Sequence, residues 1–456
     1  MPDGVSLRNF AYSSFYEIGS KKGYEVVFWN ATPFDLEDLG FREIRIKNPK
    51  LHPLTDILKA AQIRVELQLF AKRDKDPIYY GYVFPLSYRS LKSALKSFMI
   101  RWYKLRYASE IGLKRLRTRI VSLERKTDYY QDCLKVLEVE KPDFVFSASQ
   151  RSVVSIAPLT ASKDLGVPTA SFIFSWDNVP KATTVVTTDH YFVWSEHMKK
   201  ELLHYQRYIG ASQVKVTGTP QFENHFNPSV KETRETFFEI HDLDLKKDYI
   251  CFSGDDVTTS PTDDLYLRDI ASAVRTLNDN GQNLGIIFRR CPVDFSERYN
   301  KVLEAYEDII VSIEPVWKKI GDSWNTVLPT KEDLALQTNI IAHTACVVNL
   351  GSSMVFDYAC YDKPCAFINY NYLNQSKQLE KGVYVYDFVH FRSMPSKKAV
   401  VWFSSPEDIS KDLLAMLTDG KETSTAAKKW FEKINMHPPE EASKRIWDNI
   451  ENLIQR

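Results

Sequence analysis

The chain has 456 residues, of which 44% are hydrophobic and 26% are charged, and its formal net charge is +1. This length predicts two or three domains with substantial cores, and the near-zero charge argues against a protein whose overall field attracts nucleic acid. The six cysteines form no CxxC pair. This spacing argues against a zinc site or a disulfide framework and favours reduced, buried thiols.

The sequence contains no recognisable targeting or membrane-spanning segment. The first residues, MPDGVSLRNFAYSSF, lack the apolar stretch of a signal peptide. No apolar run approaches the roughly 20 residues that a membrane helix requires. We therefore expect a cytoplasmic protein, which is at most peripheral at the inner membrane face.

The first part of the chain mixes strand-like and helix-like segments. Residues 23–30 and 41–47 are typical of strands, residues 34–41 fit a short helix, and residues 54–72 have apolar side chains at helical spacing.

Residues 89–126 are helix-like and strongly basic. They contain twelve Lys and Arg residues and two acids, Glu110 and Glu124, with aromatic residues interleaved. A basic amphipathic helix of this kind can lie on an anionic membrane surface. The alternative is an ordinary solvated helix face. We treat residues 86–127 as a basic helical insertion.

From residue 141 onward, strands and helices are expected to alternate in two series. Such alternation predicts a parallel α/β sheet in each half of the chain. Two such sheets would bind ligands at the carboxyl ends of their strands, facing a cleft. Residues 227–247 are polar and are expected to cross between the halves. The strands are expected within residues 141–149, 168–178, 190–205, 212–226, 249–256, 283–292, 308–315, 347–348, 365–368 and 398–405, with a helix following the strand in 190–205 and a turn following the strand in 212–226.

Three strands of the second half are followed by polar clusters. Arginines at a strand end are costly to bury unless they meet an anion. A Gly-Ser-Ser sequence that opens a helix offers N–H groups and hydroxyls to a phosphate, and an acid on the first turn can accept hydrogen bonds from ribose hydroxyls. We therefore expect a nucleotide donor site formed by Ser253, Gly254, Asp255, Arg289, Arg290, Gly351, Ser352, Ser353 and Asp357.

Each cluster also has a purely structural explanation. Ser352 can be a helix N-cap with Asp357 as a partner of the helix dipole, and Arg289 can belong to a structural ion pair. The functional interpretation rests on finding three clusters at successive strand ends.

The stretch GSSMVFDYACYDKPCAFI, from Gly351 to Ile368, resembles the donor-binding signature of GT-B glycosyltransferases. It is especially similar to that of bacterial CDP-glycerol glycerophosphotransferases. RRCP resembles their Arg-X-His-Pro segment, with Cys291 where histidine is usual. In the first half, FSWDNVPKATT, DHYFVWSEHMKKEL and VKVTGTPQFE are similar to segments of glycosyltransferases of bacterial surface polysaccharide biosynthesis.

The resemblance implies a GT-B fold. We expect an acceptor-binding Rossmann-like domain at residues 1–235, a donor-binding Rossmann-like domain at residues 236–425, and C-terminal helices at residues 426–456 that return to the first domain. GT-B enzymes generally hold no metal, and no DxD motif stands at a donor strand end. We therefore expect no cofactor and no metal, the nucleotide-sugar being a substrate.

An inverting transfer needs a base that deprotonates the acceptor hydroxyl. Asp177 follows the apolar run ASFIF and is the first candidate, and Glu196, just beyond another strand, is the second. A turn-forming role is the alternative for Asp177. Trp176 and Asn178 are expected to contact the acceptor.

These residues predict a metal-independent, inverting glycosyltransferase that moves a sugar from a nucleotide-sugar to a glycan or lipid-linked acceptor. Two alternatives remain open: a CDP-glycerol-type polyol-phosphate transferase, and a non-catalytic protein that binds a nucleotide-sugar or a glycan. The sequence does not distinguish UDP from CMP.

Overall fold

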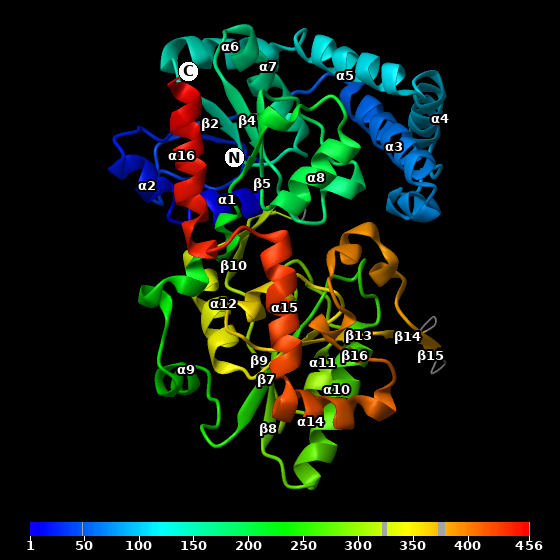
Figure 1. The fold of residues 1–456 in the computed structure, drawn as a ribbon, viewed down its shortest axis with the longest axis vertical. Helices are drawn as coiled ribbons and strands as arrows, with labels where there is room; N and C mark the ends of the chain where they lie inside the picture. Colours follow the sequence, from blue (N-terminus) through cyan, green and yellow to red (C-terminus); the bar gives the residue numbers. More distant parts are fainter. Residues whose placement is uncertain (48, 322–325, 373–378, 456) are drawn as a thin grey trace. The chain divides into compact units, whose positions relative to one another are not determined.

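A computed structural model describes residues 1–47, 49–321, 326–372 and 379–455 of the chain (Figure 1). The chain divides into two compact units. Unit 1 consists of Met1–Pro220, Phe388–His390 and Ile434–Arg456, and unit 2 consists of Gln221–Asp387 and Phe391–Lys433. The change of unit thus falls at Pro220 and Lys433, where the sequence analysis set limits at residues 235 and 425.

Unit 1 is built on a four-stranded parallel sheet of order β3-β4-β5-β6. All four strands lie where apolar runs predicted them. The central strands β4 and β5 are almost wholly buried, because helices cover the sheet, as the continuous apolar sequence of a parallel strand requires. The strands are β3 (Val145–Ser147), β4 (Thr169–Phe172), β5 (His190–Val193) and β6 (Val214–Val216).

A separate parallel pair, β1 (Phe28–Asn30) and β2 (Glu43–Arg45), also belongs to unit 1. Both strands were predicted, but they pair with each other and do not extend the main sheet. The short helix expected at residues 34–41 is instead a series of turns.

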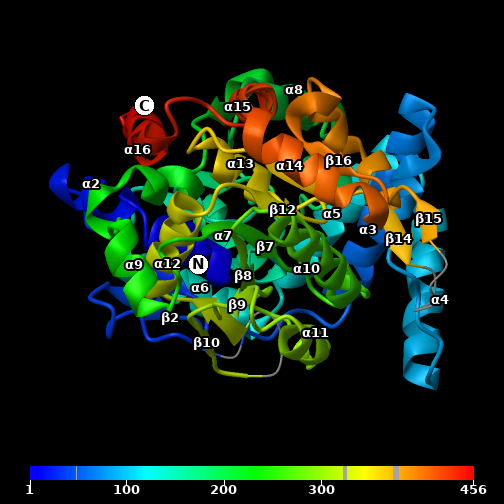
Figure 2. The same ribbon diagram turned by 90° about the horizontal axis from the view of Figure 1, so that it is seen from below.

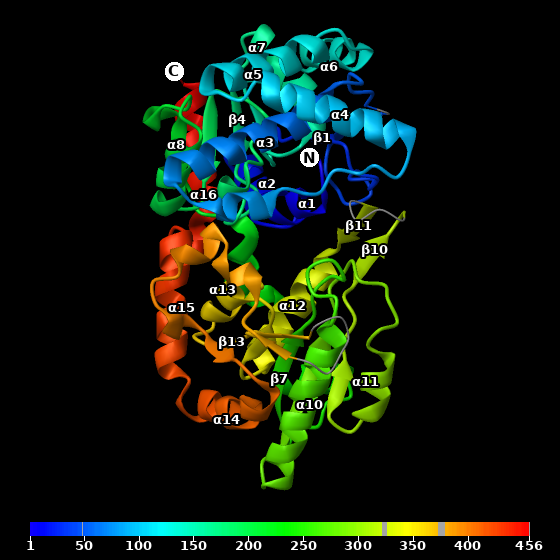
Figure 3. The same ribbon diagram turned by 90° about the vertical axis from the view of Figure 1, so that its right-hand side faces the viewer.

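The helices of unit 1 include the predicted basic insertion, which forms α4 and α5. Both pack against α3, and Leu58 and Ala61 of α3 share a buried cluster with Ile100 and Tyr103 of α4 (Figure 3). The helices are α1 (Gly4–Phe10), α2 (Phe15–Lys21), α3 (Thr55–Asp74), α4 (Leu91–Arg106), α5 (Glu110–Glu124), α6 (Asp128–Glu140), α7 (Ile156–Asp164), α8 (Glu196–Tyr205) and α16 (Ala442–Ile454).

Unit 2 is built on a six-stranded parallel sheet of order β16-β13-β12-β7-β8-β9 (Figure 2). Its core is one large apolar cluster that includes Ile250, Ile286 and Val348 from the middle strands. The strands are β7 (Asp248–Ser253), β8 (Leu284–Arg289), β9 (Ile310–Ser312), β12 (Val347–Asn349), β13 (Cys365–Ile368) and β16 (Val401–Phe403). The small pairs β10 (Trp317–Lys319) with β11 (Val327–Pro329), and β14 (Tyr370–Tyr372) with β15 (Leu379–Lys381), are antiparallel.

The helices of unit 2 alternate with its strands, and α10 and α14 pack against each other (Figures 2 and 3). The stretch at residues 227–247, expected to cross between domains, belongs to unit 2 because Phe237 and Phe238 of α9 are fully buried there. The helices are α9 (Arg234–Ile240), α10 (Asp263–Asp279), α11 (Asn300–Ala305), α12 (Lys331–His343), α13 (Met354–Ala359), α14 (Ile409–Asp419) and α15 (Lys421–Ile434), the last residue of which lies in unit 1.

The C-terminal helix α16 returns to unit 1, as expected, and packs on α2 (Figure 1). Trp447 stacks on Phe15 and donates its indole N–H to the Phe15 carbonyl at 2.7 Å. Gly19 leaves room for this ring, because a Cβ at that position would lie 2.2 Å from Trp447 Cζ2. None of the helices in the described parts of the chain has the length and apolar character that a bilayer crossing requires.

Candidate functional site

The three polar clusters of the second half lie along one edge of the unit 2 sheet. Ser253 ends β7, Arg289 ends β8, and Gly351 follows β12 after one intervening residue. These parallel strands are neighbours in the order β12-β7-β8, so their carboxyl ends meet where open α/β sheets bind ligands. The Gly254 N–H donates to the Arg289 carbonyl at 2.9 Å and so joins two of the clusters directly.

Two glycines of these clusters occupy positions that exclude a side chain. A Cβ on Gly254 would lie 3.1 Å from the Tyr299 hydroxyl and 3.3 Å from Asp263 Oδ2. Gly351 has a φ of +69°, and a Cβ there would meet the Phe391 ring at 3.1 Å. Glycine is therefore required at both strand ends, for close packing in one case and for backbone conformation as well in the other.

The serine pair differs in part from the expectation. The Ser352 N–H, expected to be free for a phosphate, donates to Asn349 Oδ1 at 2.8 Å. Ser353 caps α13, which has only six residues, and its side chain makes no capping hydrogen bond. Both serines are partly exposed. The hydroxyls of both serines are thus donors that this cluster offers to a ligand, although Ser352 Oγ also accepts the Met354 N–H at 3.4 Å.

Arg289 is held by a buried ion pair. Its Nη2 lies 2.9 Å from each carboxylate oxygen of Asp333, which also accepts the Trp317 indole N–H at 2.6 Å. The Arg289 Nη1 is buried and has no hydrogen-bond partner among the residues that the structure describes. The structural alternative given for Arg289 is therefore correct as far as Nη2 is concerned. Arg290 is half-buried, and its Nε lies 3.3 Å from Glu314 Oε2.

Asp357 differs most from its expected role. Its side chain is only 5% exposed, and its Oδ1 lies 2.8 Å from the Nε2 of His225, which is equally buried. Within the described parts of the chain, the Nδ1 of His225 has no hydrogen-bond partner. The sequence analysis missed His225 because it lies 132 residues away along the chain. Asp357 was expected to be open to a ribose, but it belongs to a buried carboxylate–imidazole pair with His225.

The SGDD sequence supplies two neighbouring carboxyl groups with opposite properties. Burial raises the pKa of Asp255 to about 7, and the nearby charges of Asp263 and Asp256 add to the effect. Burial also acts on Asp256, but hydrogen bonds from Thr258 and Thr259 hold its pKa below the ordinary value. Asp255 is therefore the acid of this edge that changes charge near neutral pH.

In unit 1, Asp177 lies five residues after the end of β4, in a turn and not at the strand end itself, and it is ion-paired with Lys181. Asn178 Nδ2 also donates to Asp177 Oδ1 at 2.8 Å. Burial alone would raise the pKa of Asp177, but the charges of Lys181 and His390 outweigh it and hold that pKa well below the usual range. Asp177 is thus a carboxylate at any physiological pH, and a weak base.

His390 is a residue of this cluster that the sequence analysis did not identify. Burial lowers its pKa to about 4, despite the opposing charge of Asp177, so the imidazole is neutral at pH 7. Tyr82 fixes it, since the Tyr82 hydroxyl lies 3.3 Å from His390 Nδ1 and accepts the Val389 N–H at 3.0 Å. The Trp176 ring meets His390 edge-on at 5.0 Å. No local pattern in the sequence connects residue 390 with residue 177.

The two residues expected to contact an acceptor are both buried. Trp176 is 6% exposed and Asn178 is 4% exposed. The Asn178 amide oxygen accepts a hydrogen bond of 3.2 Å from Gln150, whose side-chain oxygen accepts the Phe174 N–H at 2.8 Å. Neither side chain is open to a ligand, so both position the loop that carries Asp177.

Glu196, the second candidate base, is an exposed residue that opens α8. Ser195 caps this helix through its hydroxyl, which accepts the Met198 N–H at 3.2 Å. Among the described residues, no hydrogen bond or ion pair joins Glu196 to Asp177. Its position suits interaction with the helix dipole. Over the same residues, no group of three or more His, Cys, Asp or Glu side chains could hold a metal ion.

No protein-family model matches the sequence, and no curated protein matches it. Among solved structures, the chain is similar to a glycosyltransferase from Rickettsia africae ESF-5. The TM-score is 0.53 at 11% identity, over 100% of this chain and 96% of that one. This likeness extends to the fold alone. It agrees with the GT-B class predicted from the sequence: two α/β units with parallel sheets and a helical C-terminus.

Two further structures are similar at lower scores, which support no argument. One is the S. aureus MnaA-UDP co-structure, with a TM-score of 0.47 and 14% identity over 74% of this chain and 82% of that one. The other is the wall teichoic acid polymerase TagF, with a TM-score of 0.39 and 11% identity over 76% of this chain and 99% of that one.

Proposed function

We propose that the protein is a nucleotide-sugar-dependent glycosyltransferase of the GT-B type. It would transfer a sugar to a glycan or a lipid-linked acceptor in surface polysaccharide biosynthesis. The observation that carries this proposal is the convergence of three polar clusters on the carboxyl ends of β12, β7 and β8. This is the edge at which open α/β sheets bind nucleotides.

In this proposal, unit 2 binds the donor. The Ser353 hydroxyl and the unpaired Arg289 Nη1 are the donors offered to the phosphates, and Gly351 lets them approach closely. Arg290 adds positive charge. Preorganised donors of this kind stabilise the charge that develops on a leaving phosphate. Transfer without a bound metal is part of the proposal.

Unit 1 would supply the base. Asp177 and His390 lie together, and the neutral imidazole is the stronger base of the two because the pKa of Asp177 is far lower. We assign the acceptor proton to His390, with Asp177 stabilising the imidazolium that forms. The hydroxyl oxygen attacks the anomeric carbon as the bond to the leaving phosphate breaks, and this direct displacement inverts the configuration.

A second candidate reaction is the transfer of a polyol phosphate from a CDP-polyol. The buried His225–Asp357 pair of unit 2 favours it, because a carboxylate-oriented imidazole suits proton transfer at a phosphoryl group. Product analysis separates the two reactions. From a CDP-linked donor, a sugar transferase releases CDP, whereas a polyol-phosphate transferase releases CMP.

The partner proposed for the basic insertion is an anionic membrane surface. Leu91, Leu95, Phe98, Trp102 and Leu105 follow the 4-3 spacing of one helix face, and their exposed fractions run from 51% to 92%. Ile100 and Tyr103 face the other way, into the core. α4 thus presents an exposed apolar stripe on the surface of unit 1.

The charge of α4 favours a membrane over a second copy of the chain. Between Leu91 and Arg106 there are five Lys or Arg residues and no acid, so two such helices would repel each other, whereas anionic lipid attracts each basic residue. Part of the insertion is structural instead: Arg117 pairs with buried Glu66, and Arg125 with Asp164. The proposed surface is therefore α4, at the cytoplasmic face of the membrane.

Sedimentation with phosphatidylglycerol liposomes tests this partner. Phe98→Ser with Trp102→Ser should abolish binding, whereas Ile240→Ser, which removes an exposed side chain from unit 2, should not. Failure of the wild-type protein to sediment at low salt would remove the proposal. So would a dimer that the double variant dissociates.

A donor-consumption assay with UDP-, CMP-, CDP- and GDP-linked substrates tests the enzymatic proposal. Asp177→Asn and His390→Gln should each lower kcat by about 100-fold or more, and Ser353→Ala should mainly raise the KM for the donor. Glu239→Ala, an exposed change on α9, serves as the control. Turnover that all three site variants retain would refute the assignment.

A further inference from the structure

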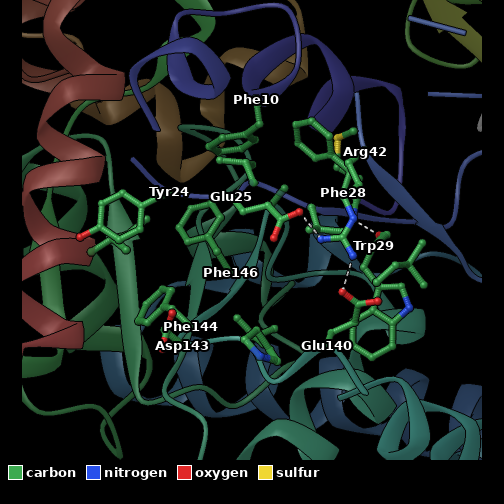
Figure 4. A pocket seen from close by; sticks show the side chains of 18 of the residues that line it. Phe10, Tyr24, Glu25, Phe28, Trp29, Arg42, Glu140, Asp143, Phe144 and Phe146 are labelled. Atoms are coloured by element: carbon green, nitrogen blue, oxygen red, sulfur yellow. Dashed lines mark hydrogen bonds and ion pairs between the residues drawn. The ribbon is translucent and has the colours of Figure 1, made fainter. Parts of the chain in front are cut away.

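A cavity of about 410 Å³ lies within unit 1 and is lined in part by Phe15 and Trp447, but by none of the candidate site residues described above (Figure 4). It is bounded by β1 on one side and by the edge strand β3 on the other, with α16 closing a third side. β1 pairs with β2 and β3 pairs with β4, and the described strands show no pairing between β1 and β3. The hollow therefore occupies the interval between the two sheets of this unit.

Aromatic rings form a fixed wall of this cavity. Tyr24 and Phe15 both stack on Trp447 with ring centroids 5.1 Å apart, and Phe10 meets Phe146 edge-on at 5.3 Å. Gly19 packs so closely against the Trp447 ring that there is no room for a Cβ. Protein interiors hold few voids larger than a water molecule. A hollow of this size, with walls already packed in place, is typical of a small-molecule site.

A charged group also lines the cavity, next to Phe28 and Trp29 (Figure 4). Figure 4 shows Arg42 between Glu25 and Glu140, with Nη1 2.5 Å from Glu25 Oε1 and Nη2 2.7 Å from Glu140 Oε2. Asp143 and Lys141 also line the cavity. Arg42 and Glu25 remain exposed. Each carboxylate has a second oxygen, so the charged group presents fixed acceptors together with a guanidinium donor.

These walls select a class of ligand. Three carboxylates against two basic side chains disfavour a phosphate or a nucleotide. An acyl chain is also disfavoured, because it would displace water from the charged groups and offer them no hydrogen bonds in its place. A sugar ring suits both the aromatic wall and the charged group, because its C–H face packs on aromatic rings and its hydroxyls donate to carboxylates and accept from arginine. We propose that this cavity binds a neutral saccharide unit.

The proposal goes beyond the transferase assignment and does not depend on it, because a saccharide can bind here whether or not the protein transfers sugar. None of Trp176, Asp177, Asn178 or Glu196 lines the cavity. For an enzyme that works on a glycan, such a site would hold a part of the chain other than the reacting end.

Saturation-transfer NMR with neutral disaccharides tests the proposal. The probes are maltose, cellobiose, mannobiose and diacetylchitobiose at about 10 mM, a concentration suited to weak binding, with glucose 6-phosphate and octanoate as the anionic and the acyl probe. At least one disaccharide should receive saturation, and neither of the other two probes should.

Glu140→Gln should weaken saccharide binding by about tenfold, as expected when one charged hydrogen-bond acceptor is lost, and Phe146→Ala should abolish it. Glu239→Gln, an exposed change on α9 of unit 2, is the matched control and should leave binding unchanged. Circular dichroism checks the fold of each variant, and Glu140→Gln carries the test if Phe146→Ala unfolds. The absence of transfer to every disaccharide would overturn the proposal, as would equal binding by wild type and Glu140→Gln.

Discussion

Replacing Asp255 with asparagine should stabilise the protein at pH 8 and change its stability little at pH 4. Burial raises the pKa of Asp255 from 3.8 to about 7. Between these two values the folded protein holds a proton that the unfolded chain has lost, so the free energy of unfolding falls as the pH rises through this window. Asparagine cannot ionise, and it preserves the acceptor for the Asp256 N–H, which lies 2.8 Å from Asp255 Oδ1.

The size of the effect follows from the same values. The free energy of unfolding falls by about 1.4 kcal/mol for each pH unit between 3.8 and about 7. The ionisation of Asp255 therefore lowers the stability of the wild-type protein by about 4 kcal/mol at pH 8. Asp255→Asn should recover most of this. The adjacent residue supplies a control of opposite sign: the pKa of Asp256 is lowered by its threonine partners. Its carboxylate stabilises the fold above pH 3.8 and that contribution disappears as the pH falls below it, so Asp256→Asn should destabilise at pH 8.

Urea denaturation followed by tryptophan fluorescence at pH 4, 6 and 8 measures both variants. The difference between Asp255→Asn and wild type should grow steadily from pH 4 to pH 7 and then level off. A difference independent of pH, or a loss of stability at pH 8, would show that Asp255 is not held protonated by its surroundings.

Asp333→Asn should lower the free energy of unfolding by about 3–5 kcal/mol, because it leaves the buried guanidinium of Arg289 without its counter-charge; urea denaturation at pH 7 measures this. Lys181→Met removes a cation that helps to lower the pKa of His390, the proposed base, so the acid limb of the pH–rate profile should move to higher pH, and an unmoved limb would contradict the role of Lys181. Gly351→Ala should cost about 1–3 kcal/mol because φ is +69°, and its thermal midpoint should fall accordingly.

The sequence was sufficient to predict the strands of both sheets and their polar ends, because these features are local. An apolar run such as that of β8 must be buried, and the arginine that follows it must lie at the sheet edge. Strand order was not predicted. The adjacency of β12, β7 and β8, which brings the three clusters together, arises from long-range pairing that no single segment encodes.

The residues that contact the site residues could not be predicted from the sequence either. Asp357 and Arg289 were expected to face a ligand, but each satisfies a buried charge with a distant residue, His225 in one case and Asp333 in the other. A charged group at a strand end meets either a ligand or a counter-ion, and its local sequence is the same in both cases. Asp177 was predicted to end a strand but lies in a turn beyond β4, and its neighbour His390 comes from a distant segment.

Thermal unfolding in the presence of UDP, CMP, CDP and GDP tests the central claim most directly, that the strand-end edge of unit 2 binds a nucleotide. A ligand at 100 times its Kd stabilises the folded state by about 2.7 kcal/mol, so one of the four should raise the midpoint selectively. Ser353→Ala should reduce that rise without altering the midpoint of the free protein. No rise with any of the four at millimolar concentration, or an equal rise in wild type and Ser353→Ala, would contradict the account.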